Sequence, residues 1–247
     1  MLTLAVTRPG EPEIFASLQG EGPSIGRPSV FLRLSRCNLA CVWCDTAYTW
    51  RFTGDARPHR TEAFHDRTAN QMKLAEDDIA VRILALDPSR LVVTGGEPLL
   101  QAPALTRLLA LLRAERPGLH AEIETNGTVA APPALDALID QYNVSPKLTH
   151  SGNAAALALI PERLRAYAAD PRAFFKFVAA EPFDLDEIAG LQLAYGIDST
   201  QLFVMPEGTD SAALRDRMRW LAPECQRRGW RLTDRLHIHL YGDTRGT

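Results

Sequence analysis

The sequence has few cysteines, no excess of basic residues and no long apolar segment, and each of these properties excludes a class of protein. Only four cysteines occur among 247 residues, and three of them fall within eight residues, which is too close for a secreted disulfide framework. Lys and Arg total 27 against 30 Asp and Glu, a formal net charge of −3, so no basic excess favours a nucleic-acid partner. No segment approaches the roughly 18 consecutive apolar residues of a membrane span. We therefore expect a cytoplasmic protein that binds a small molecule, with neither nucleic acid nor membrane as a partner.

The remaining composition is that of an ordinary folded protein. Apolar residues make up 46% and charged residues 23% of the chain, so a packed core is expected. A chain of 247 residues is long enough for one large α/β domain or for two small ones. Because no change in composition divides the chain, we expect a single domain over residues 1–247.

The chain from residue 76 onward alternates between helical patterns and short apolar runs, which is typical of a parallel sheet with helices outside it. Residues 51–75 are polar and show no sustained period, which predicts an irregular insertion. The roughly six strand–helix units are too few for an eight-unit barrel, so we expect an α/β fold with an open, partial parallel β/α barrel. The expected strands are 29–34, 90–94, 120–124, 142–145, 173–178, 201–204 and 235–240, and the expected helices are 76–86, 103–115, 133–140, 161–169, 184–195 and 210–228.

The clearest chemical motif is the spacing C-x3-C-x2-C formed by Cys37, Cys41 and Cys44. A structural zinc ion takes four protein ligands, and no fourth cysteine or close-set histidine stands near these three. A [4Fe-4S] cluster held by three cysteines keeps one iron open, and that iron can bind the amino and carboxylate groups of S-adenosylmethionine (SAM). Cys225 stands apart in an expected helix, and we interpret it as a buried structural thiol. A zinc or electron-transfer centre completed by Cys225 or by a distant histidine is the alternative.

Three further motifs follow expected strands, where function concentrates in parallel β/α folds. Residues 94–98 read Thr-Gly-Gly-Glu-Pro, so paired glycines would let the backbone approach a ligand and Glu97 could accept from an ammonium group. Glu124 opens a Glu-Thr-Asn-Gly sequence that could meet a ribose, and Ser145 and Lys147 supply a hydroxyl and an ammonium group. Each motif could also be a plain turn, since Gly-Gly and Asn-Gly are common turn pairs.

The cysteine spacing, with the aromatic Trp43 before the last cysteine, and the Gly-Gly-Glu-Pro element resemble the signature of the radical SAM superfamily. Segment 14–22, Arg33, the Cys-Asp-Thr sequence ending at Thr46 and the Ser-Pro-Lys element narrow the resemblance to the 7-carboxy-7-deazaguanine synthase family, over nearly the whole chain. The resemblance implies a lyase that converts 6-carboxy-5,6,7,8-tetrahydropterin into 7-carboxy-7-deazaguanine with loss of ammonia, on the route to queuosine. It also implies a flavodoxin or ferredoxin as reductant and a homodimer.

The resemblance assigns roles to individual residues. Arg33 would face the substrate carboxylate, because a guanidinium fork suits two oxygens. We further expect the hydroxyl of Thr46 to help bind Mg²⁺, since hard cations take oxygen ligands, although a loop-capping role for this hydroxyl is the alternative. The substrate would be bound by Leu18, Gln19, Gly20, Arg33 and Thr94. SAM would be bound by Gly96, Glu97, Glu124, Ser145, Pro146 and Lys147, and along one strand by Gln201, Leu202, Phe203, Val204 and Met205.

Two regions depart from the family pattern: the insertion at 51–75 and the C-terminal part of the chain. His237 and His239 alternate on the expected strand 235–240, so at most one of them would face the barrel. Two other functions stay open. One is an activating enzyme for a glycyl-radical partner protein, and the other is a non-catalytic Fe–S or zinc module; cleavage of SAM would separate either enzyme from the module.

Overall fold

One mixed sheet of eleven strands runs through the computed structural model, which describes residues 1–247. The parallel strands are, in spatial order, β4 (Pro28–Leu34), β6 (Arg90–Gly95), β7 (His120–Thr125), β8 (Gln141–Val144), β9 (Ala173–Ala179), β10 (Leu202–Pro206) and β11 (Arg231–Leu232). β4 and β11 do not pair with each other, so the parallel part of the sheet stays open. The expected partial β/α barrel is confirmed.

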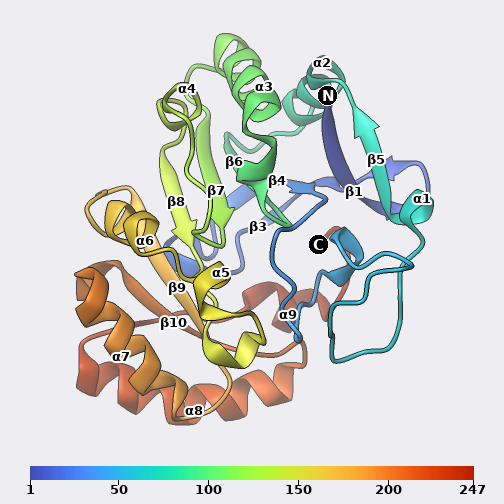
Figure 1. The fold of residues 1–247 in the computed structure, drawn as a ribbon. Coiled ribbons are helices and arrows are strands. Elements are labelled where there is room, and N and C mark those ends of the chain that lie inside the picture. Colours follow the sequence, from blue (N-terminus) through green and yellow to red (C-terminus); the bar gives the residue numbers. More distant parts are fainter.

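Helices pack around the outside of this sheet (Figure 1). In α3 (Ala102–Glu115), Leu105, Leu108 and Leu109 follow the spacing of one helix face and are fully buried. Helix α8 (Ser211–Arg228) begins after Asp210, whose carboxylate accepts from two backbone N–H groups, and ends before Gly229, which has the left-handed conformation. No helix has the length and apolar character that crossing a membrane requires. The helices between parallel strands are α2 (Glu76–Leu84), α3 (Ala102–Glu115), α4 (Pro133–Asp136), α5 (Ala155–Ala158), α6 (Pro161–Ala168), α7 (Asp184–Tyr195) and α8 (Ser211–Arg228).

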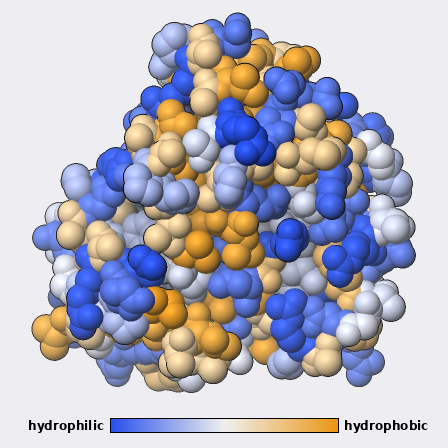
Figure 2. Space-filling model, turned by 45° about the horizontal axis from the view of Figure 1, so that its top comes forward, coloured by the Kyte–Doolittle hydropathy of each residue, from blue (hydrophilic) through white to orange (hydrophobic).

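The apolar side chains form two separate clusters. The main core joins 39 buried residues between the sheet and the helices. A small second cluster of Ala40, Ala47 and Trp50 lies at the cysteine loop, and Cys37 and Cys44 pack against it. The face of the molecule drawn in Figure 2 mixes hydrophilic and hydrophobic residues. The cysteine loop therefore has an apolar support of its own, apart from the main core.

Four antiparallel strands extend the sheet beyond β4. β3 (Ile14–Leu18) runs antiparallel to β4 with Phe15 opposite Phe31, and the two rings stack with centroids 5.1 Å apart. This pairing places segment 14–22, which we call the N-terminal motif, beside β4, the first strand of the barrel. These strands are β1 (Leu2–Arg8), β2 (Glu11–Pro12), β3 (Ile14–Leu18) and β5 (Gln71–Leu74).

Two sequence-based expectations are wrong. The insertion at 51–75 is not wholly irregular, because it ends in the short helix α1 (Arg67–Asn70) and in β5, which pairs with β1. The expected strand 235–240 is the helix α9 (Leu236–Tyr241). Its Leu-His-Ile-His-Leu alternation suits a strand, but a segment this short takes its conformation from tertiary contacts, here the bond from Leu236 N to Gly20 O.

Other element boundaries shift as well. β10 begins one residue and ends two residues later than expected, since 199–201 form a 3₁₀ turn before it. Helix α4 covers a single turn of the expected 133–140, because the N–H groups of Leu138 and Ile139 bond to carbonyls three residues back and tighten the chain before β8.

Candidate functional site

A cavity of about 580 Å³ lies against the inner face of the sheet. Its walls come from β3, β4 and the ends of the next five parallel strands. The cysteine loop, part of the insertion and the C-terminal segment border it as well. The expected site residues that line it are Leu18, Gln19, Gly20, Arg33, Cys37, Cys41, Cys44, Thr46, Thr94, Gly96, Glu124, Ser145, Lys147 and Met205.

Six other expected SAM-binding residues do not line the cavity. Leu202 and Val204 are fully buried in the main core, and Phe203 packs edge-on against Phe174. Gln201 lies at the opposite end of β10, where its amide donates to the carbonyls of Asp170 and Ala173. The strand boundary explains the difference, because the end of β10 that reaches the cavity carries Met205 and the residues after it. The six residues are Glu97, Pro146, Gln201, Leu202, Phe203 and Val204.

The three cysteines of the loop after β4 all face this cavity. Burial raises the pKa of Cys37 to about 12 and that of Cys44 to about 11, so these thiols stay protonated until a metal displaces the protons. The thiols do not converge on one point as ligands of a single ion would. A cubane does not need this, because each thiolate binds a different iron. Three soft sulfur donors on one partly buried loop fit a [4Fe-4S] cluster.

The paired glycines Gly95 and Gly96 let two segments of backbone pack closely against each other, which is a different role from the expected approach to a ligand. A Cβ on Gly95, whose φ is +124°, would lie 2.0 Å from Leu34 O, and a Cβ on Gly96 would lie 2.0 Å from Arg36 O. Their backbone also bonds there, with Gly96 N donating to Leu34 O (3.1 Å). The glycines therefore bring the end of β6 against the start of the cysteine loop.

The carboxylate of Glu97, which was expected to accept from an ammonium group, accepts here from donors of the protein itself. The side chain is fully buried and accepts from Asn126 N (2.7 Å), from Leu99 N (3.1 Å) and from the hydroxyl of Thr125 (2.9 Å). Burial raises the pKa of Glu97 to about 7, against the effect of the two N–H donors. The carboxylate thus fastens the loop after β6 to the loop after β7.

We predict that Glu97→Gln lowers the free energy of unfolding by about 1 to 3 kcal/mol, because an amide cannot accept from all of these donors. Urea unfolding of the apoprotein measures the loss. Glu115→Gln, at an exposed position near the end of α3, is the matched control and should change little. Equal stability of the two variants would contradict the fastening role.

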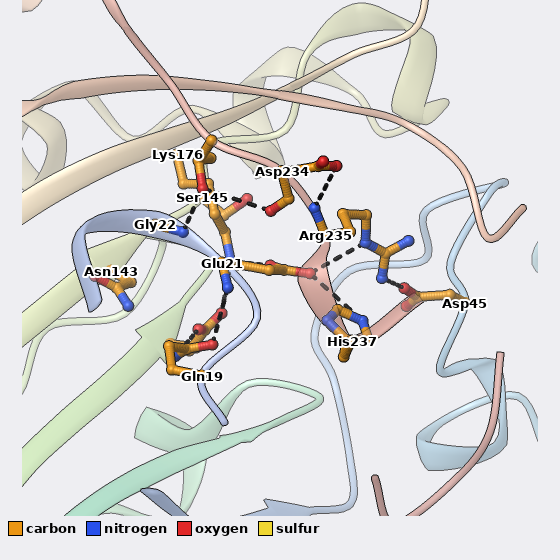
Figure 3. A network of polar contacts seen from close by, with 12 residues as sticks. Gln19, Glu21, Gly22, Asp45, Asn143, Ser145, Lys176, Asp234, Arg235 and His237 are labelled. Carbon is orange, nitrogen blue, oxygen red and sulfur yellow. Dashed lines mark hydrogen bonds and ion pairs between the residues drawn. The ribbon is translucent and has the colours of Figure 1, made fainter. Parts of the chain in front are cut away.

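A buried ion network forms one side of the cavity (Figure 3). Glu21 pairs with both Lys176 and Arg235, Lys176 also bonds Glu124 at 2.8 Å, and Arg235 reaches Asp45. Burial disfavours the ionised form of Glu21, but the charges of Lys176 and Arg235 outweigh it and hold its pKa far below the usual range. The network therefore links the N-terminal motif, β9, the cysteine loop and the segment before α9.

Gln19 and Gly20 meet this network from the N-terminal motif. The amide of Gln19 donates to Glu122 (2.7 Å) and to Glu124 (3.2 Å). A Cβ on Gly20 would lie 2.2 Å from Nδ1 of His237, so only glycine leaves room for this histidine. Burial lowers the pKa of His237 and so favours the neutral form of its ring.

Arg33 forms an ion pair with a buried glutamate of the protein itself. Its Nε donates to Glu13 (2.7 Å), a fully buried carboxylate that also accepts from the hydroxyl of Tyr48 (2.9 Å). Burial disfavours the charged guanidinium, but Glu13 outweighs this and raises the pKa of Arg33. The guanidinium is thus held in one orientation at the cavity wall.

Several cavity residues escaped sequence reasoning. Lys176 is a charge inside the apolar run Ala173–Ala179, and this contrast was a readable sign of a paired, functional lysine. Of the two histidines, only His237 faces the cavity, from α9, while His239 bonds Ser211 and Asp234. At most one was expected to face the barrel, although from a strand. Trp50 and Arg235 carried no pattern of their own, whereas Glu21 and Asp45 stand inside the motifs of segment 14–22 and Cys-Asp-Thr.

Comparison with known proteins agrees with this site. The sequence pattern of the radical SAM superfamily matches residues 32–151. The chain is 37% identical to the 7-carboxy-7-deazaguanine synthase of Pyrobaculum aerophilum over 95% of both chains. It is 36% identical to that of Halobacterium salinarum, over 94% of this chain and 90% of the other. The crystal structure of QueE from Escherichia coli matches with a TM-score of 0.66 and 26% identity, over 95% of each chain.

The three comparisons agree with one another and with the cysteine loop and cavity described above. Identity above 30% extends over almost the full length of both relatives, and the shared fold extends over almost the full length of the solved structure. The chain belongs to the 7-carboxy-7-deazaguanine synthase family of the radical SAM superfamily.

Proposed function

We propose that this chain converts 6-carboxy-5,6,7,8-tetrahydropterin into 7-carboxy-7-deazaguanine with loss of ammonia. The observation that carries the proposal is that one cavity gathers the cluster cysteines, five of the eleven residues expected to bind SAM and all five residues expected to bind the pterin. As in the superfamily, the cofactors are a [4Fe-4S] cluster and SAM, which together supply a 5′-deoxyadenosyl radical for hydrogen abstraction.

The chain's own residues would bind and orient the two small molecules. Lys147 donates to Ser145 Oγ (2.8 Å) and lies over the ring of Trp43, where its ammonium suits the carboxylate of SAM. The guanidinium of Arg33, fixed by Glu13, suits the carboxylate of the pterin. Glu13 keeps this guanidinium from turning away, so the pterin would be held in one orientation.

An anaerobic assay of the cluster-loaded protein tests the proposal. Formation of 5′-deoxyadenosine distinguishes an enzyme from a non-catalytic Fe–S or zinc module. Consumption of the pterin, with a purine-like ultraviolet product, distinguishes the synthase from an activating enzyme for a glycyl-radical protein. Cleavage of SAM without any effect of the pterin would overturn the proposed substrate.

We also propose that Thr46 helps to bind Mg²⁺ together with the substrate. Thr46 Oγ1 lies 3.6 Å from Cys44 Sγ, and this hydroxyl caps no backbone amide of the following 3₁₀ turn, which leaves its oxygen for another partner. One hydroxyl cannot hold the ion alone, so substrate oxygens and water would complete the shell. The metal would then orient the pterin for hydrogen abstraction.

We predict that Mg²⁺ stimulates turnover of the wild type and that Thr46→Ala requires roughly tenfold more of the ion. Thr46→Ser keeps the hydroxyl and is the matched control. A titration of turnover against Mg²⁺ in chelator-treated protein gives the result. A wild type that responds neither to chelation nor to added Mg²⁺ would rule out the site.

Two partners complete the proposal. A flavodoxin or ferredoxin would supply the electron, because reductive cleavage of SAM needs a one-electron donor. The chain would form a homodimer, since the open barrel leaves sheet edges at β2 and β11 that a second copy can cover. Light scattering of the purified protein measures the second point. Three closely spaced thiols suit the reducing conditions of the cytoplasm, where we place the enzyme.

A further inference from the structure

Segment 50–61, which we name the cluster cover, packs directly on the cysteine loop. The ring Nε2 of His59 lies 3.0 Å from the carbonyl oxygen of Cys44. The backbone N–H of Arg60 donates to Val42 O at 2.6 Å. The cover is therefore tied to the cysteine loop at two backbone positions, on either side of Trp43.

Trp50 is the residue of the cover that meets a cluster thiol. Its Nε1–H donates to Cys44 Sγ at 3.3 Å, and its side chain is 5% exposed. The guanidinium of Arg57 lies 4.6 Å from the indole centroid, and the ring of His59 meets the indole edge-on at 6.1 Å. These two contacts from the cover hold the indole N–H towards the sulfur.

A second N–H group reaches another cluster thiol from a different part of the chain. Asn153, in the loop before α5, donates from Nδ2 to Cys41 Sγ at 3.3 Å. Its Oδ1 accepts from Ala40 N at 3.0 Å, which fixes the amide in this orientation. Two of the three cluster sulfurs thus have N–H donors from outside their own loop.

We propose that Trp50 and Asn153 are positioning residues that set the reduction potential of the cluster. An N–H dipole directed at a thiolate sulfur stabilises the reduced cluster, which carries one more negative charge, more than the oxidised cluster. Hydrogen bonds to the sulfurs therefore raise the potential. Burial strengthens the effect, because the dipoles act in a medium of low dielectric constant. The inference depends on the cluster and not on the identity of the substrate.

A redox titration of the anaerobically reconstituted protein tests the role of Trp50. Dithionite supplies one electron per cluster, and electron paramagnetic resonance measures the reduced fraction at each potential. At a fixed potential we expect Trp50→Phe to lower the ratio of reduced to oxidised cluster roughly tenfold, which is about 59 mV for a one-electron couple. Trp230→Phe is the matched control, because the Nε1 of Trp230 donates to Gln192 (2.8 Å) away from the cavity.

A second variant, Asn153→Ala, keeps the proposal testable should Trp50→Phe fail to hold a full cluster. It removes the other N–H···S bond without disturbing the indole, and its effect should add to that of Trp50→Phe because the donors act on different sulfurs. Iron and sulfide analysis shows that each variant is fully loaded. An unchanged ratio in either fully loaded variant, or an equal fall in Trp230→Phe, would overturn the proposal.

Discussion

Replacing any one of Cys37, Cys41 or Cys44 by Ala is expected to abolish both iron binding and cleavage of SAM. A site with two thiolates cannot hold the cubane, and no other cysteine faces the cavity. The pKa values of Cys37 and Cys44 are raised by burial to about 12 and about 11, so these thiols lose their protons only when the metal binds, and a site with one thiolate fewer binds it more weakly. Iron content and visible absorption after reconstitution measure the first loss, and 5′-deoxyadenosine formation measures the second.

Cys225→Ala is the matched control for these variants. Cys225 is 2% exposed and packs in the main core from α8. Removing its sulfur should cost some stability through the small cavity left behind, but it should leave the iron content unchanged. Bleaching of the cluster absorption in Cys225→Ala would mean that the three-cysteine ligand set is wrong.

Arg33→Ala is expected to weaken binding of the pterin by roughly 2 to 5 kcal/mol and to affect SAM far less. The guanidinium would otherwise meet a desolvated carboxylate at the cavity wall. Calorimetric titrations of the cluster-loaded protein with the pterin and with SAM measure the two affinities. Cleavage of SAM without coupling to the pterin should persist in this variant.

The ion pair with Glu13 requires a control, since Arg33→Ala also leaves a buried carboxylate without its counter-charge, which destabilises the fold. Arg113→Ala is a suitable control, because the half-buried Arg113 pairs with Asp140 at 2.6 Å and lies outside the cavity. It should lose stability and keep its affinity for the pterin. Equal loss of pterin and SAM binding in Arg33→Ala would show that Arg33 only supports the fold.

The sequence predicted the parts of the molecule that depend on local pattern. Alternating apolar runs and helical periods between residues 76 and 228 led to an open parallel barrel, because strand–helix repeats leave few other arrangements. The cysteine loop was readable for the same reason, since its three ligands lie within one short segment. Thirteen of the residues expected to bind substrate, SAM or the cluster line the cavity, among them Arg33 and Lys147, and Thr46 lines it as well.

The ion network was not predictable, because its partners are far apart in the chain. Lys176 and Glu21 are 155 residues apart, and Arg235 and Glu21 are 214 apart. No periodicity connects such residues, and a single sequence does not say which charges will meet. The same limit applies to α9, whose short alternating pattern fits a strand as well as a helix until Gly20 is brought beside it.

The large sequence separation between Glu21 and Arg235 affects the order in which parts of the enzyme can fold during synthesis. At about 5 to 20 residues per second, a ribosome needs on the order of 10 to 40 s to synthesise the 214 residues between them. During that time the N-terminal motif lacks two of its native contacts. These are the bond from Gly22 N to the hydroxyl of Thr233 and the bond from Leu236 N, at the start of α9, to Gly20 O. Contacts this distant also slow the search for the native state. We expect the iron–sulfur centre to be loaded after translation, once the last helix has docked.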